Sequence, residues 1–267
     1  MDSEIVHEEE IAALREYVKK NFTIWDAHMH LGLDIDTKHM DITSLINLMA
    51  AKGIQKAAVF PLDDPRKGES FSRPNDVIRD TCKKFPRKFL PFFRLNPNVR
   101  WKEEFSRCHN SGFRGIKLHP RSQNFHVDSK EAMSIYYNAE KSALPVLLHA
   151  GKGLENIAKK LLQISRQFPD IVIIAAHSVY MDIDNAIDLL SARKQIYFEL
   201  SATKPDVILK VMDSIPAERI LYGTDSPYIP IDAMLDRTLT AYSQSSLGRA
   251  DLKNILSANL QKLLRGI

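Results

Sequence analysis

The chain has 267 residues, 44% of them hydrophobic, and its 37 basic and 33 acidic residues give a formal net charge of +4. This length suits one large α/β domain, and the mild, dispersed charge argues against nucleic acid or a membrane as a partner. Two cysteines rule out a disulfide framework, no apolar run is long enough to span a membrane, and residues 1–10 are acidic where a secretory signal would be basic and then apolar. We therefore expect a cytoplasmic protein with reduced thiols.

Strand-like and helix-like segments alternate along the whole chain. The first helix-like segment, residues 5–20, is expected to cover one end of the fold, and the last, residues 250–264, carries an apolar stripe. Eight apolar strand candidates lie between them, at residues 23–28, 56–61, 89–96, 113–119, 145–149, 172–177, 196–201 and 220–225. Helical patterns follow these strands at residues 42–52, 75–84, 103–110, 129–141, 154–167, 184–192, 206–213 and 231–242.

Near-continuous apolar strands that alternate with helices indicate parallel strands covered on both faces. Eight such units, without a Pro/Gly/Ser-rich linker or a charge block, predict one domain over residues 1–267. Its fold would be an α/β (β/α)8 TIM barrel with an extra N-terminal helix and a C-terminal helix. An open doubly wound sheet is the alternative, but no Gly-X-Gly-X-X-Gly motif follows the first strand.

Side chains with the chemistry of metal ligands close several of these strands. His28 and His30 end the first one, and residues two apart in a strand project from the same face, so both imidazoles can reach one ion. His149, His177 and Asp225 close three later apolar runs in the same way.

The spacing of these residues tests whether they belong together. From His30 to Lys117 is 87 residues, from Lys117 to His149 is 32, then 28 to His177 and 48 to Asp225. Each interval is a whole number of plausible βα repeats. We therefore expect the set at one level, at the C-terminal ends of strands one, four, five, six and eight, where barrel active sites are built.

These motifs resemble the amidohydrolase superfamily, in the branch of metal-dependent hydrolases and decarboxylases called amidohydrolase family 2. The matching pieces span nearly the whole chain, at residues 26–30 (DAHMH), 112–120 (GFRGIKLHP), 149–151 (HAG), 176–178 (AHS), 223–227 (GTDSP) and 255–260 (ILSANL). The resemblance implies that His28, His30, His149 and Asp225 bind a divalent metal, and that Asp225 is the general base for a metal-activated water. It gives His177 either a metal-ligand role, as in two-metal relatives, or a catalytic role in polarising substrate or moving a proton.

A set of histidine and aspartate ligands suits Zn²⁺, which we expect, and also accepts Mn²⁺ or Fe²⁺. In two-metal relatives a strand-four lysine is carboxylated and bridges the ions. We favour one ion, with two ions as the alternative, and expect Lys117 and His119 to bind a substrate carboxylate from one face of their strand. Arg94, near the end of the third strand, is a further candidate for binding an anionic substrate. Glu199 and Ser201 alternate on the seventh strand and are expected to line the pocket.

The leading functional hypothesis is a metal-dependent hydrolase of a small-molecule amide, ester or lactone. The alternative is a metal-dependent decarboxylase, a lyase, of an unsaturated or aromatic carboxylic acid. A nuclease of the TatD type has less support, because no basic stripe is visible and strand four offers Lys117 in place of a carboxylate. A barrel that only binds is disfavoured by the presence of all five candidate ligands. We expect the partner to be a small-molecule substrate, and we favour one that carries a carboxylate. The sequence is also compatible with a homodimer.

Overall fold

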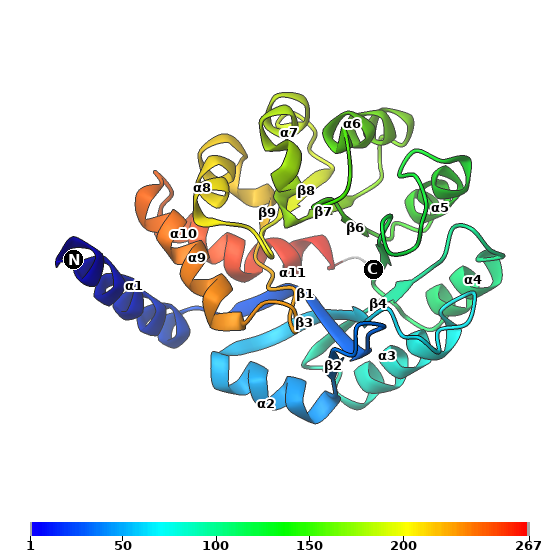
Figure 1. The fold of residues 1–267 in the computed structure, drawn as a ribbon, viewed down its shortest axis with the longest axis horizontal. Coiled ribbons are helices and arrows are strands. Elements are labelled where there is room, and N and C mark those ends of the chain that lie inside the picture. The colour runs from blue at the N-terminus through cyan, green and yellow to red at the C-terminus, as the bar shows by residue number, and fades with distance from the viewer. Residues whose placement is uncertain (1, 266–267) are drawn as a thin grey trace.

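Nine strands form one curled sheet in the order β2-β1-β3-β4-β5-β6-β7-β8-β9 (Figure 1). The structure is a computed structural model that describes residues 2–265. The parallel strands are β1 (Ile24–Leu33), β3 (Ile54–Pro61), β4 (Phe89–Arg94), β5 (Gly115–Leu118), β6 (Val146–His149), β7 (Ile173–Ala176), β8 (Ile196–Glu199) and β9 (Ile220–Leu221). The short strand β2 (His39–Met40), which the sequence did not predict, runs antiparallel to the end of β1.

Backbone hydrogen bonds between β1 and the segment that begins with β9 close the sheet into a barrel. The N–H of Ala27 donates to the carbonyl oxygen of Tyr222 at 2.9 Å, and the N–H of Asp225 donates to that of His28 at 2.8 Å. The predicted TIM-barrel class is therefore confirmed, and its eight strands are β1 and β3 to β9.

Helices surround the barrel on its outer face, as Figure 1 shows. They are α2 (Ile42–Lys52), α3 (Ser72–Lys84), α4 (Lys102–Asn110), α5 (Lys130–Lys141), α6 (Ile157–Gln167), α7 (Ile183–Leu190), α8 (Pro205–Ser214) and α9 (Ile231–Gln244). Asp41 and Ser129 start α2 and α5 as N-caps, because their side chains accept the N–H groups of Ser44 and Ala132. Within residues 2–265, no helix combines the length and the apolar character needed to cross a membrane.

Side chains from six barrel strands and the C-terminal helix α11 (Asn259–Leu263) fill the barrel interior. The buried cluster consists of Ala27, Ala58, Phe60, Phe92, Leu147, Ile174, Ala176, Leu221, Leu260 and Leu264. On β5, Gly115 makes room for the ring of Phe92, because a Cβ there would lie 2.3 Å from ring carbon Cε1. Trp25 and Leu90, near the beginnings of their strands, also pack against this cluster. Helix α11 therefore closes the end of the barrel opposite the carboxyl ends of the strands.

The C-terminal helical segment is interrupted, where the sequence predicts one continuous helix. It consists of α10 (Arg249–Lys253), a π-helical turn (Asn254–Ala258) and α11. In the π-helical turn the carbonyl oxygen of Ile255 accepts the N–H of Tyr222 at 3.0 Å. The side chain of Asn259 donates to the carbonyl oxygens of Ala217 and Ile220, each at 2.8 Å. These bonds fasten the segment to the start of β9.

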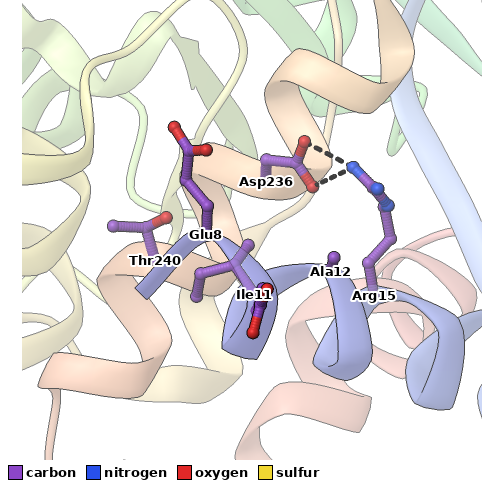
Figure 2. Close-up of a pocket in the computed structure, with 7 residues that line it drawn as sticks. Glu8, Ile11, Ala12, Arg15, Asp236 and Thr240 are labelled. Carbon is purple, nitrogen blue, oxygen red and sulfur yellow. Dashed lines mark hydrogen bonds and ion pairs between the residues drawn. The ribbon is translucent and has the colours of Figure 1, made fainter. Parts of the chain in front are cut away.

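The N-terminal helix α1 (Asp2–Asn21) packs against α9 on the outside of the ring, so the expectation that it covers one end of the fold is wrong. Figure 2 shows Arg15 reaching across to α9, where its Nη1 lies 2.8 and 2.6 Å from the two carboxylate oxygens of Asp236. Helix α1 buries a narrow stripe that includes Ile11 and Val18, and charged residues such as Glu8, Glu9 and Lys20 are exposed on it. Such a helix suits an outer surface, whereas the plug in the barrel needs the apolar face of α11.

Candidate active site

The polar residues predicted to act together all lie where the parallel barrel strands finish. The strand that carries or precedes each of them is β1 for His28 and His30, β5 for Lys117, β6 for His149, β7 for His177 and β9 for Asp225. One ligand atom each from His28, His177 and Asp225 lie within 4.8 Å of one another. The expectation that these distant segments converge at one level is therefore met by the geometry.

His28 and His30 both face the interior, although β1 is not regular there. The pairing of β1 with β3 shifts between Asp26 and Met29. The Oδ1 atom of Asp26 accepts the N–H of His28 at 2.8 Å and the N–H of Thr224 at 3.2 Å. Asp26 therefore holds the irregular part of β1 against the segment after β9. The two imidazole centroids lie 5.3 Å apart.

The five candidate ligands form an arc along the mouth of the barrel. At one end, Oδ1 of Asp225 lies 3.0 Å from Nε2 of His30 and 3.1 Å from Nε2 of His28. At the other end, Nε2 of His177 lies 3.0 Å from Nδ1 of His149. The rings of His28 and His177 join the two halves, with centroids 5.2 Å apart. The order along the arc is thus His30, Asp225, His28, His177 and His149.

Hydrogen bonds at the outer edges of three rings determine which nitrogen atoms face the centre. Carbonyl and carboxylate oxygens only accept, so the ring nitrogen beside each of them carries the proton. The three contacts are His28 Nδ1 to Glu199 Oε2 at 2.8 Å, His177 Nδ1 to the carbonyl oxygen of Ser201 at 3.1 Å, and His149 Nε2 to the carbonyl oxygen of Lys152 at 3.2 Å. When these rings are neutral, the other nitrogen of each turns a lone pair inward.

Three inward lone pairs beside the Asp225 carboxylate are the donor set that a divalent metal ion requires. In particular, His177 and His149 turn two accepting nitrogens toward each other at 3.0 Å, a contact that is repulsive unless a proton or a cation lies between them. The residues therefore fit a divalent ion. His30 fits less completely, because its Nδ1 is buried and has no hydrogen-bond partner within the described part of the chain that would fix its tautomer.

The protonation states also suit metal binding. Burial lowers the pKa of His30 to about 3 and is the main cause that lowers the pKa of His149 and His177. Burial and a nearby ammonium lower the pKa of His28, but the two carboxylates beside it outweigh them and raise it. Burial raises the pKa of Asp225, but the adjacent histidines outweigh burial and hold it well below its usual value. At neutral pH the site thus offers neutral rings at His30, His149 and His177 and an ionised Asp225, whereas His28 favours its charged form and would release a proton on binding a metal.

Lys117 lies among the candidate ligands and is almost fully buried, with 1% of its surface exposed. Its Nζ lies 3.2 Å from Nε2 of His28 and 4.8 Å from the centre of the Phe60 ring. Burial lowers the pKa of Lys117 to about 7. This position agrees with both roles that the resemblance allows, a carboxylated bridge between two ions and a positive charge beside one.

Arg94 lies beside Lys117, because the two residues are partners in the pairing of β4 with β5. Its guanidinium is buried and donates to Oγ of Ser122 at 3.1 Å, and it lies 3.9 Å from a carboxylate oxygen of Asp63. Burial lowers the pKa of Arg94 to about 10. Its Nε has no hydrogen-bond partner among the described residues. Arg94 is therefore a buried cation at the mouth of the barrel whose Nε donor is available to a ligand.

His119 lies one residue beyond β5 and supports the arc from the side. Its ring stacks on that of His149, with centroids 3.9 Å apart and planes 10° apart. The N–H of Ser122 donates to its Nδ1 at 3.2 Å, which leaves the proton of the neutral ring on Nε2. Burial is the main cause that lowers the pKa of His119 far below its usual value. His119 is thus a neutral donor next to a candidate ligand.

Two candidate site residues sit in strained backbone. His177 has φ 60°, followed by Ser178 at 51° and Val179 at 56°, and Asp225 has φ 66°. Positive φ is disfavoured for non-glycine residues, most of all for β-branched ones, and such strain gathers at active sites. The turns after β7 and β9 therefore direct these two side chains in a way that local sequence preference does not favour.

Glu199 has a larger part in the site than the sequence indicated. It is fully buried behind His28 and Ser201, whereas we expected Glu199 and Ser201 only to line the pocket. One signal in the sequence points to Glu199, since it is a carboxylate at the end of an otherwise apolar run, and a buried charge needs partners. Which partners it has depends on strands that are distant in sequence.

Comparisons with known proteins bear on the family and the fold of the chain. The family model Amidohydro_2, described as amidohydrolase, matches residues 25–266. No curated protein matches the chain. Among solved structures, the chain is similar to 2,6-dihydroxybenzoate decarboxylase in complex with 2,6-dihydroxybenzoate, at 20% identity and TM-score 0.71, over 91% of this chain and 99% of that one.

Two further solved structures have the same fold. A dihydroxybenzoic acid decarboxylase from Polaromonas sp. JS666, with bound manganese and 2-nitroresorcinol, has 18% identity and TM-score 0.72 over 91% of this chain and 97% of that one. A probable 2-pyrone-4,6-dicarboxylic acid hydrolase from Acinetobacter baumannii, with citric acid bound, has 16% identity and TM-score 0.64 over 91% and 100%. At these identities the similarity shows the fold.

Proposed function

We propose that this chain, which belongs to the amidohydrolase family, is a divalent-metal-dependent hydrolase of an amide, ester or lactone in a small, carboxylate-bearing molecule. The observation that carries the proposal is the arc itself. His28 turns a lone pair toward the Asp225 carboxylate, His177 and His149 turn lone pairs toward each other, and the outer nitrogens of all three rings are fixed by accepting oxygens. These four residues would hold the ion, with His30 as a further ligand beside Asp225.

A bound divalent ion would polarise the scissile carbonyl and lower the pKa of a water molecule toward about 7. Asp225 is ionised at neutral pH, so it can take the proton of the attacking water and pass it to the leaving nitrogen or oxygen. The products are then an acid and an amine or alcohol. We assign His177 to ligation, because its lone pair faces the centre and its outer N–H is held by the carbonyl of Ser201.

Lys117 and Arg94 supply the positive charge for an acidic substrate. They are neighbours across two strands, both are buried, and a carboxylate between them would recover the cost of holding two cations out of water. We propose one ion per chain, with Lys117 as an electrostatic residue. Two metal equivalents together with a carboxylated Lys117 would contradict that assignment.

Decarboxylation is the second candidate, and the same pair of cations favours it. In that reaction the bond from the carboxylate carbon to the ring breaks, carbon dioxide leaves, and the ring carbon takes up a proton. Two of the similar structures carry the names of dihydroxybenzoate decarboxylases. Both reactions would use Asp225 and the metal, so the products must distinguish them.

The test is an assay of metal-stripped protein reloaded with Zn²⁺ or Mn²⁺. The panel holds carboxylate-bearing amides, esters and lactones, and aromatic acids such as 2,6-dihydroxybenzoate. Hydrolysis that stops in chelator is the expected result. Carbon dioxide release without hydrolysis would establish the second candidate in its place. If neither metal supports turnover of either kind, the proposed function is wrong.

Asp225→Asn tests the proposed base within the same assay. Loss of a general base is expected to lower kcat by about 10²- to 10⁴-fold. His126→Ala is the matched control, because His126 is exposed and lies outside the arc, and its kcat should be unchanged. An Asp225→Asn protein that stays within about tenfold of the unaltered kcat would remove Asp225 from this role.

A further inference from the structure

Glu199 contacts the site from behind, away from the centre of the arc. Its side chain is fully buried at the end of β8. Oε2 lies 2.8 Å from Nδ1 of His28 and accepts the hydroxyl of Ser201 at 2.7 Å, while Oε1 accepts the N–H of Ser201 at 2.7 Å. The backbone N–H of His177 also donates to Oε2, at 3.5 Å. The carboxylate therefore contacts one histidine ring, the backbone of a second histidine, and the backbone and side chain of Ser201.

Ser201 extends these contacts to a second histidine. Its hydroxyl oxygen lies 3.0 Å from Nδ1 of His177 and 3.2 Å from Nδ1 of His28, and its carbonyl oxygen lies 3.1 Å from Nδ1 of His177. Because the hydroxyl donates its proton to Glu199, it faces both rings as an acceptor. The outer nitrogen of His28, on β1, thus meets both Glu199 and Ser201, and that of His177, after β7, meets Ser201, which lies two residues beyond the end of β8.

The neighbouring strand segment leaves room for this arrangement. Gly223 lies beside Glu199, and a Cβ at Gly223 would be 2.1 Å from Oε1 of Glu199 and 3.0 Å from Cβ of His28. Any side chain there would displace the carboxylate or the histidine, so the glycine is required by the close approach of Glu199.

We propose that Glu199, acting with Ser201, is a positioning residue that fixes His28 and His177 in one tautomer and one orientation, with both Nε2 atoms toward the ion. The inference rests on the metal site of the proposed function. In this arrangement one carboxylate contacts His28 directly and reaches His177 through Ser201, so the two histidines are oriented together. Partners behind metal-binding histidines typically contribute about 10- to 100-fold to metal affinity.

The test measures Zn²⁺ and Mn²⁺ dissociation constants of metal-stripped variants by calorimetry. Glu199→Ala removes both contacts and should weaken binding about 100-fold, whereas Glu199→Gln should weaken it about 10-fold. The glutamine is weaker than the glutamate because its amide NH2 must face either the His28 N–H or the Ser201 N–H. Gly223→Ala should reproduce the loss without changing Glu199 itself. Nitrogen-15 NMR of the Zn²⁺ form should show Nδ1–H on both rings, and its signal at His28 should weaken in the Glu199 variants.

Glu218→Gln is the matched control, because Glu218 is exposed and lies just before β9. The metal affinity of this variant should equal that of the unaltered chain. Glu199→Gln preserves shape, so it keeps the test valid if Glu199→Ala or Gly223→Ala fails to fold. If the unaltered chain binds neither metal, the proposed function and this inference are both wrong. If it binds metal and Glu199→Gln binds as tightly, with its Nδ1–H signals unchanged, only this inference is overturned.

Discussion

The buried Asp26 and Glu199 and the half-buried Asp225 lie in or beside the site, and their partners give these three carboxylates different charges. Asp26 accepts mainly backbone N–H groups, and burial raises its pKa to about 7. For Glu199 and Asp225 burial acts in the same direction, but the histidines beside them outweigh it and lower the pKa. At neutral pH the two carboxylates that face imidazoles are thus ionised, while Asp26 is close to half protonated and acts as a structural link between β1 and the segment after β9.

Asp26→Asn tests that contrast through the pH dependence of stability. The folded chain holds the Asp26 proton more tightly than the unfolded chain, so the free energy of unfolding falls as pH rises from about 4 to about 7. This loss approaches about 1.4 kcal/mol per pH unit, and it is absent when an amide replaces the acid. We therefore expect urea unfolding in chelator to show that, between about pH 5 and about pH 7, the free energy of unfolding of Asp26→Asn rises relative to that of the unaltered chain. Parallel stability curves for the two proteins would contradict the raised pKa.

The arrangement of elements follows from periodicity where local pattern decides it. The helix predicted at residues 42–52 matches α2, and the helix predicted at residues 129–141 matches α5 together with its N-cap, Ser129. Three features depend on distant contacts instead: β2 pairs with the end of β1, the π-helical turn gives its Ile255 carbonyl to Tyr222, and α1 packs on α9. A sequence pattern shows that a helix has an apolar stripe, but it does not show which surface receives that stripe.

The two terminal helices should therefore differ in what they contribute to stability. Leu260 of α11 is buried in the barrel interior, whereas Leu14 of α1 is half-buried on the outer surface. Leu260→Ala is expected to cost about 2–5 kcal/mol, and Leu14→Ala less than about 2 kcal/mol, because a surface site loses less burial and leaves no closed cavity. Urea unfolding of both variants measures this. An equal or larger loss for Leu14→Ala would mean that α1, and not α11, is the helix that the barrel requires.

For the whole molecule, the register of the barrel explains why the candidate ligands were predictable and why their orientation was not. The carboxyl ends of the parallel strands lie at one end of the barrel, so His177 meets both His149 and His28 whatever the intervening loops contain. The order along the arc and the proton on each ring depend on groups such as Glu199 and the Lys152 carbonyl. The Lys152 carbonyl is only three residues from His149, but the contact between Glu199 and His28 joins segments 171 residues apart, so no local motif encodes it.

Because the ligands come from opposite ends of the chain, metal binding should stabilise the whole barrel. Binding to the folded state alone adds about 2.7 kcal/mol to the free energy of unfolding at a free ion concentration of about 100 times the dissociation constant. We expect Zn²⁺ to raise the unfolding midpoint of the unaltered chain and of His126→Ala, and chelator to reverse the change. A double variant, His28→Ala with Asp225→Asn, removes both ends of the β1–β9 contact from the donor set and should lose the metal-dependent increase. If that variant is stabilised by Zn²⁺ as strongly as the unaltered chain, the ion binds elsewhere and the arc is not the metal site.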